Sequence, residues 1–284
     1  MGIYSVEGLS ISKIGDLLVE QLGQSAGDYV FPNDFLKAVA DIDFSGVVVS
    51  GDSAPYDLVI IGNAWSKMVR WTNDNNLGVL YKSVRFVGVP SEIPDFAFRK
   101  QTALKSVVIP NGTAAIGQQA FRLCSGLESI TVPDSVTTIG VSAFYGCSSL
   151  EQIICNGVTA FTDDGNVAAK FGDCLSLKVA RFPKVVSAAS RSGSAGTFNN
   201  CTALETVQFG SVGHPCNTVT AGNFNGCTQA GLTIEIYANN NISTIVSNIR
   251  STATNATIVI KAATDLVYNG TNYAEGDTVV TSTP

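Results

Sequence analysis

The chain has 284 residues, of which 45% are hydrophobic and only 14% charged, so its polar surface has to come mainly from Ser, Thr, Asn and Gly. A formal net charge of −6, with no basic cluster longer than Arg99-Lys100, disfavours a nucleic-acid partner. No apolar run approaches the roughly 20 residues of a membrane helix, and the first residues lack the basic and apolar segments of a signal peptide. We therefore expect no membrane insertion and find no export signal.

Residues 1–45 are expected to form a small helical N-terminal cap. After Ser12, which suits an N-cap, apolar residues recur at helical spacing through residues 14–22. A second amphipathic helix is expected to start near residues 33–34 and to run to residue 42.

Residues 46–80 are expected to supply capping strands, at 47–50 and 58–61, that lead into an internal repeat over residues 81–231. In this repeat a Leu recurs after 23, 23, 27, 27 and 28 residues, a Phe recurs at similar intervals, and a Cys follows each of the last five Phe residues by three positions. The three series are Leu104, Leu127, Leu150, Leu177, Leu204 and Leu232; Phe98, Phe121, Phe144, Phe171, Phe198 and Phe224; and Cys124, Cys147, Cys174, Cys201 and Cys227.

Each repeat is expected to contribute one short strand. Counting the Leu of each repeat as position 0, positions 3 and 5 are also apolar, and a Pro or Gly soon afterwards turns the chain. A unit of 23 residues cannot bury its own apolar face, so successive coils have to stack with their strands in a parallel ladder about 4.8 Å apart. The sequence therefore predicts a repeat solenoid, mostly β, with columns of identical or similar side chains inside it.

Two consecutive repeats in residues 116–150 share a more specific set of motifs. The pair Ile-Gly at 116–117 and 139–140 is followed by Ala-Phe, then by Cys and Leu, and the strand between them ends in Val132-Pro133. This pattern resembles the BspA-type leucine-rich repeat family. The resemblance implies a right-handed leucine-rich-repeat coil, a role in surface recognition or adhesion, and no catalytic residue.

Residues 232–284 are expected to form a C-terminal cap and hairpin. Strands at 233–237 and 257–260 would flank a helix at 242–250. The glycine-punctuated residues 265–284 are expected to form the hairpin.

The seven cysteines invite a disulfide or metal hypothesis, but their placement favours small buried side chains. Five share one repeat column, Cys155 replaces a core Ile or Val, and Cys216 lies outside the pattern. The stacking distance alone does not forbid disulfides between neighbouring coils. Zinc would need a compact set of three or four ligands, and the sequence has no C-x-x-C pair and only one histidine. We expect buried, reduced thiols, with no metal and no cofactor.

His214 and Cys216 would have to reach each other by a hydrogen bond to act as a hydrolase pair, and their Pro-containing loop favours an exposed histidine instead. The stretch Asp163-Asp164-Gly165-Asn166 is similar to part of a calcium loop but lacks its remaining ligands, which favours a polar turn. We assign no catalytic residue and expect that the protein is not an enzyme.

Two surfaces are candidates for binding a partner. Three consecutive coils are lengthened, and we expect the added residues, near 161–166, 189–196 and 213–218, to lie on one side; neutral drift in tolerant loops is the alternative. The other candidate is the outer face of the strand ladder, for which the sequence favours the alternative of a merely solvated sheet, because it shows no exposed apolar patch. The candidate residues are Asp163, Asp164, Asn166, Arg191, Ser192, His214 and Asn217 in the loops, and Arg85, Thr131, Ile154, Arg181 and Gln208 on the ladder.

The function that the sequence favours is non-enzymatic recognition or adhesion, with a host-surface protein or glycan as the partner and a cell-surface or extracellular location. The alternative is a structural or receptor-binding component of a phage or prophage tail. It depends on residues 14–39, which resemble a short module at the start of tail-associated proteins of bacteriophages and prophages.

Overall fold

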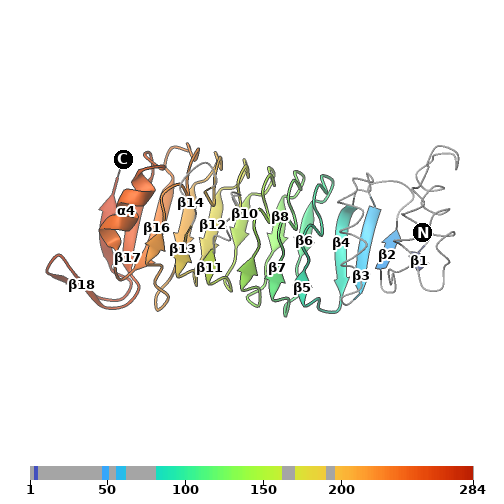
Figure 1. Cartoon of the computed structure of the whole chain (residues 1–284), viewed down its shortest axis with the longest axis horizontal. Helices are drawn as coiled ribbons and strands as arrows, with labels where there is room; N and C mark the ends of the chain where they lie inside the picture. Colours follow the sequence, from blue (N-terminus) through green and yellow to red (C-terminus); the bar gives the residue numbers. More distant parts are fainter. Residues whose placement is uncertain are drawn as a thin grey trace.

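The computed structural model describes residues 3–5, 47–50, 56–61, 81–161, 170–189 and 196–283. Over these residues the chain winds into an elongated solenoid whose coils succeed one another from the N-terminal to the C-terminal end (Figure 1). The predicted repeat solenoid with parallel strands is therefore confirmed. The two helices expected within residues 1–45 lie outside the described residues.

The predicted strands follow one another coil by coil in a first ladder, which is divided into three hydrogen-bonded sheets. Ser106 pairs with Ser129 across 23 residues, and Gln152 pairs with Val179 across 27, as the repeat intervals require. The strands of this first ladder are β4 (Tyr81–Val87), β6 (Ser106–Val108), β8 (Ser129–Thr131), β10 (Gln152–Ile154), β12 (Val179–Phe182), β14 (Thr206–Phe209), β16 (Thr233–Ala238) and β17 (Thr257–Ala262).

The six coils that begin with β4, β6, β8, β10, β12 and β14 each contain a second strand, so the expectation of one strand per repeat was wrong. These second strands are only two residues long and pair in parallel with their counterparts in the next coil. Two residues are too few to show a period-2 pattern in the sequence. The strands of this second ladder are β5 (Glu92–Ile93), β7 (Ala115–Ile116), β9 (Thr138–Ile139), β11 (Ala160–Phe161), β13 (Ser187–Ala188) and β15 (Thr218–Val219).

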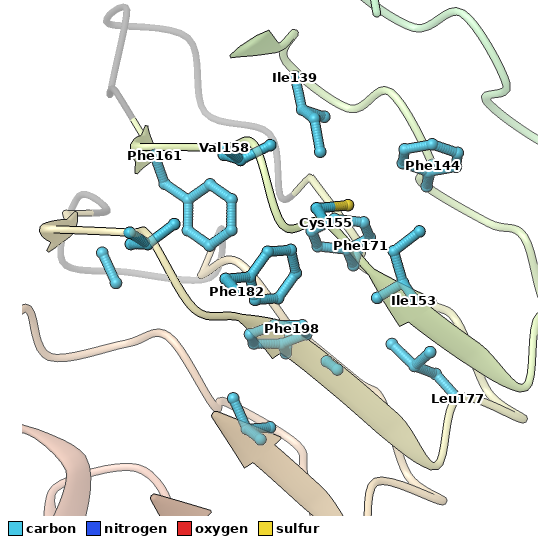
Figure 2. Packing of buried hydrophobic residues seen from close by; sticks show 14 of the residues in the cluster. Ile139, Phe144, Ile153, Cys155, Val158, Phe161, Phe171, Leu177, Phe182 and Phe198 are labelled. Carbon is cyan, nitrogen blue, oxygen red and sulfur yellow. The ribbon is translucent and has the colours of Figure 1, made fainter. Parts of the chain in front are cut away.

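The core consists of the predicted columns. The Leu column from Leu104 to Leu204 is fully buried. The six Phe rings of the Phe column are stacked, with successive ring centroids 5.2–5.7 Å apart and ring planes within 3–18° of parallel. Figure 2 shows how Phe161 and Phe182 add further rings beside Phe171 in the longer coils; their centroids are 4.7 Å apart. Stacked and edge-to-face aromatic pairs of this kind stabilise the core beyond their buried area.

The thiols of the Cys column donate hydrogen bonds to the backbone of the preceding coil. The Cys124 thiol donates a hydrogen bond to the carbonyl oxygen of Phe98 at 2.9 Å, and each later cysteine of the column bonds the Phe of the preceding coil in the same way. In the first coil the slot is filled by Gln101, whose side-chain oxygen accepts a hydrogen bond from the Tyr81 backbone N–H at 2.7 Å. A polar group at this position therefore links neighbouring coils in every case.

The Leu series has one error of register. Thr206 pairs with Thr233, an offset of 27 residues, so the residue aligned with Leu204 is Gly231 and not Leu232. Leu232 is buried nevertheless. It lies one residue before the start of β16, whereas Leu204 lies two residues before the start of β14.

The two ends are closed by different elements. At the N-terminal end, β2 (Val47–Ser50) pairs antiparallel with both β1 (Ile3–Ser5) and β3 (Tyr56–Ile61), and β3 pairs in parallel with β4. The strands expected at 47–50 and 58–61 are confirmed, whereas β1 was not expected.

At the C-terminal end, α4 (Ile242–Arg250) lies between β16 and β17 in the chain, as predicted. The expected hairpin covers only part of residues 265–284. β18 (Leu266–Tyr268) and β19 (Thr271–Tyr273) form it, while β20 (Thr278–Ser282) returns to pair antiparallel with β17.

Candidate binding surface

The outward residues of the first ladder form a regular surface, called here the ladder face. The inward residue of β10 is buried and its neighbours point outward, and the other strands follow the same alternation, with Ile130 of β8 half-buried. Ile154, Arg181 and Gln208 pair directly in register, and Val108 pairs with Thr131 in the same way. The structure thus brings Thr131, Ile154, Arg181 and Gln208 onto one face, as the sequence suggested; Arg85 lies in β4, and its side chain is outside the described residues.

The ladder face is more apolar than the sequence suggested. Val108 is 65% exposed and Ile154 is 36% exposed, whereas Thr131 and Arg181 are exposed polar neighbours. Gln208 is half-buried, and its amide donates to the carbonyl oxygen of Gly210. Exposed aliphatic side chains set among polar ones are typical of surfaces that contact other proteins.

Two ion pairs between neighbouring coils border this face, next to the starts of the strands. Lys105 and Glu128 form an ion pair of 2.7 Å between coils, and Glu151 pairs with Lys178 at 3.7 Å. All four side chains are well exposed, so each pair contributes at most about 1 kcal/mol to stability. Their opposite signs nevertheless favour this stacking register over a shifted one.

Of the loop candidates, only the two in the third lengthened coil can be placed. Asp163, Asp164, Asn166, Arg191 and Ser192 lie outside the described residues. His214 is exposed, with its Nδ1 atom 3.3 Å from the carbonyl oxygen of Val212, which confirms the expected exposed loop histidine.

The three lengthened segments do not share one place in the coil. Phe161, Ala188 and Val219 occupy equivalent positions in the second ladder. Phe171 follows Phe161 by 10 residues and Phe198 follows Ala188 by 10, but Phe224 follows Val219 by only 5. The extra residues of the first two coils therefore come after the second strand, whereas those of the third come before it. The expectation of a single lengthened side was wrong, because total coil length does not reveal where a short second strand lies.

The third lengthened segment, residues 210–217, is tied to both neighbouring coils. The Ser211 hydroxyl donates to the carbonyl oxygen of Pro183 at 2.8 Å, and the Cys216 N–H donates to that of Tyr237 in β16 at 2.7 Å. The side-chain oxygen of Asn217 accepts from the backbone N–H groups of Asn239 and Asn240. Asn217 thus has a clear role in coil stacking, which the sequence did not reveal.

The thiols are placed where nucleophilic chemistry is disfavoured. All seven cysteines are buried free thiols, which confirms the predicted burial. Burial raises the pKa of Cys124 to about 12 and that of Cys216 to about 11, so both stay protonated near neutral pH. The Cys216 thiol is directed to the carbonyl oxygen of Thr218, 3.6 Å away.

The part of the chain that the structure describes offers neither a metal site nor a membrane-spanning helix. Within it, no group of three or more His, Cys, Asp or Glu side chains is arranged to hold a metal ion. No helix there has the length and apolar character needed to cross a bilayer.

Comparison with known structures finds several bacterial leucine-rich repeat proteins. A leucine-rich repeat protein from T. pallidum is 23% identical over 68% of this chain and 82% of its own, with a TM-score of 0.41. A leucine-rich cell surface protein from Faecalibacterium prausnitzii is 20% identical over 82% of this chain and 58% of its own, with a TM-score of 0.46. A protein from Bacteroides ovatus is 20% identical over 69% of this chain and 50% of its own, with a TM-score of 0.34. A search of curated proteins finds no significant match.

The comparison with family models is decisive. The model of the BspA-type leucine-rich repeat region matches residues 91–228 and 165–269, with six copies of the repeat. These residues contain the Leu, Phe and Cys columns, the second ladder and every strand of the first ladder except β4. The chain belongs to the BspA-type leucine-rich repeat family.

Proposed function

We propose that this protein is a non-enzymatic recognition or adhesion protein that binds another protein through its ladder face. The observation that carries the proposal is the pair of exposed aliphatic residues, Val108 and Ile154, set among Thr131 and Arg181 on a rigid parallel sheet. The neighbouring outward positions are fixed by ladder hydrogen bonds, so the surface needs little ordering when a partner binds.

The absence of catalysis is part of the proposal. Leucine-rich repeat families are typically binding scaffolds, and the buried cysteines of this chain have raised pKa values. We also propose a cell-surface or extracellular location, where a host-surface protein would be within reach. The phage-tail alternative depends on residues 14–39, outside the described part, and the family match gives it no support.

The test is a binding screen against purified host-surface proteins and glycans, followed by charge insertion at the ladder face. Val108→Glu combined with Ile154→Glu should weaken any reproducible interaction at least about tenfold, because a charge at the centre of an apolar contact must be desolvated. Val186→Glu is the matched control, since Val186 is 48% exposed but precedes β13 and is not on the ladder face.

Each outcome discriminates between surfaces. Loss of binding in the control alone, or equal loss in both variants, contradicts the ladder face as the site. Joint replacement of Asp163, Asp164, Arg191 and His214 by Ser tests the loops. If binding is lost only in this loop variant, the site belongs to the lengthened loops.

A further inference from the structure

The third side of the coils, formed by the turns that carry the Phe column, bears a row of cationic and aromatic residues. In successive coils the residue after the column Phe is Arg99, Arg122 and Tyr145. Backbone hydrogen bonds of 2.7 Å join Lys100 N–H to the carbonyl of Arg122 and Leu123 N–H to that of Tyr145. The three residues therefore lie in successive coils. At these coils the centroids of neighbouring rings in the Phe column are 5.2–5.3 Å apart.

The two guanidinium groups rest on aromatic rings. Arg99 lies over the Phe96 ring at 5.8 Å, and Arg122 lies over the Tyr145 ring at 5.3 Å. Arg122 also donates to the side-chain oxygen of Gln119 at 3.1 Å. The Nε atoms of both arginines are buried without a hydrogen-bond partner, and no carboxylate in the described part of the chain pairs with either arginine.

Three ion pairs join neighbouring coils elsewhere in the described residues, although Glu128 and Glu151 are like charges one coil apart. Where charged side chains of neighbouring coils meet in Lys105–Glu128, Glu151–Lys178 and Glu235–Lys261, the signs are opposite. Arg99 and Arg122 are instead like charges one coil apart, with Lys100 beside them, in a chain of net charge −6. Like charges at this separation repel each other, and stacking of the coils does not require them.

We propose that Arg99 and Arg122 form a docking site for an acidic helical segment of a partner protein. Each guanidinium presents a planar fork of donors that suits bidentate pairing with a carboxylate. Carboxylate side chains three or four positions apart on a helix have Cβ atoms about 5–6 Å apart, close to the spacing of one coil. The guanidinium groups already cover the Phe96 and Tyr145 rings, which disfavours a glycan that would stack its sugar rings there.

The test uses a fluorescent helix-forming peptide with Glu pairs at i and i+4, together with its Glu→Gln analogue. The Glu peptide should bind the protein, the affinity should fall with salt, and the Gln peptide should bind at least about tenfold more weakly. Arg99→Gln combined with Arg122→Gln should weaken binding of the Glu peptide by a similar factor. Arg99→Lys combined with Arg122→Lys should restore only part of the affinity, since an ammonium group cannot pair bidentately.

The matched control is Lys105→Gln combined with Lys178→Gln, which removes the same charge from the ladder face. The proposal is overturned if this control weakens binding as much, if the Glu and Gln peptides bind alike, or if a sulfated oligosaccharide binds at the arginines while the Glu peptide does not. Thermal unfolding of each variant verifies folding. Arg99→Gln alone is the fallback variant, because it leaves the hydrogen bond between Arg122 and Gln119 intact. Since this site is on a different side of the coil from the ladder face, Val108→Glu should leave peptide binding unchanged.

Discussion

Single residues show how closely the coils approach one another. At Gly117 a Cβ atom would lie 2.5 Å from the backbone nitrogen of Asp95 and 2.6 Å from the carbonyl carbon of Pro94 in the preceding coil. The Gln118 N–H next to it donates to the Asp95 carboxylate at 2.7 Å. Glycine is needed here for space, and the Ile-Gly motif that marks the repeat in the sequence therefore has a steric cause.

Gly117→Ala should lower the free energy of unfolding by about 2–3 kcal/mol, because the neighbouring atoms are backbone and cannot rotate away. Gly213→Ala is the control: its φ of +74° disfavours a side chain, but its Cβ would meet nothing within 4 Å. We expect the control to lose only about 1 kcal/mol from backbone strain. Urea titration of both variants measures the difference, and equal losses would contradict the close approach at Gly117.

At the scale of one element, the Cys column couples stability to alkaline pH. Burial raises the pKa of Cys124 from 9.0 to about 12. Above pH 9 the thiol therefore ionises in the unfolded chain but stays protonated in the folded one, so stability is lost as the pH rises from about 9 toward 12. The contribution of Cys124 alone should be about 1 kcal/mol between pH 9 and 10.

This is measured by urea titration of the native chain and Cys124→Ala over that pH range. The variant should lose stability with pH less steeply, whatever its stability at neutral pH. Parallel slopes for the two proteins would mean that the thiol is accessible to solvent in the folded state.

Whether an element could be predicted from the sequence depends on its length and on whether its contacts are with distant segments. The first ladder, the Phe and Cys columns, α4 and the strands flanking it were predicted, because apolar residues at fixed intervals have to be buried together. The second ladder has two-residue strands that leave no periodic signal, and this omission misplaced the third lengthened segment. The pairing of β20 with β17 and the internal role of Asn217 depend on contacts between distant segments, which spacing alone does not encode. The ladder candidates were found because outward positions follow directly from the inward ones.

At the scale of the whole molecule, a solenoid exposes apolar surface and unpaired strand edges at both ends unless caps cover them. At the C-terminal end, α4 buries Ile242, Ile245 and Ile249, and its Asn248 amide donates to the carbonyl oxygen of Val219 in the last strand of the second ladder. Strand β20 covers the edge of β17 in the first ladder. The cap thus closes both ladders, and one residue, Arg250, connects its parts.

The Arg250 guanidinium donates hydrogen bonds to the carbonyl oxygens of Thr254 and Ala256 and to that of Ser282 at the end of β20. Arg250→Ala should lower the free energy of unfolding by about 2–3 kcal/mol, because it removes charge-assisted hydrogen bonds. Contacts in a solenoid are made with nearest neighbours, so amide hydrogen exchange should accelerate in β20 and β17 and stay unchanged in β8 and β10. Arg181→Ala, an exposed arginine on the ladder face, should change neither stability nor exchange at the cap. Acceleration spread evenly along the whole solenoid would instead show that the coils unfold as one cooperative unit and that Arg250 has no special role in closing the end.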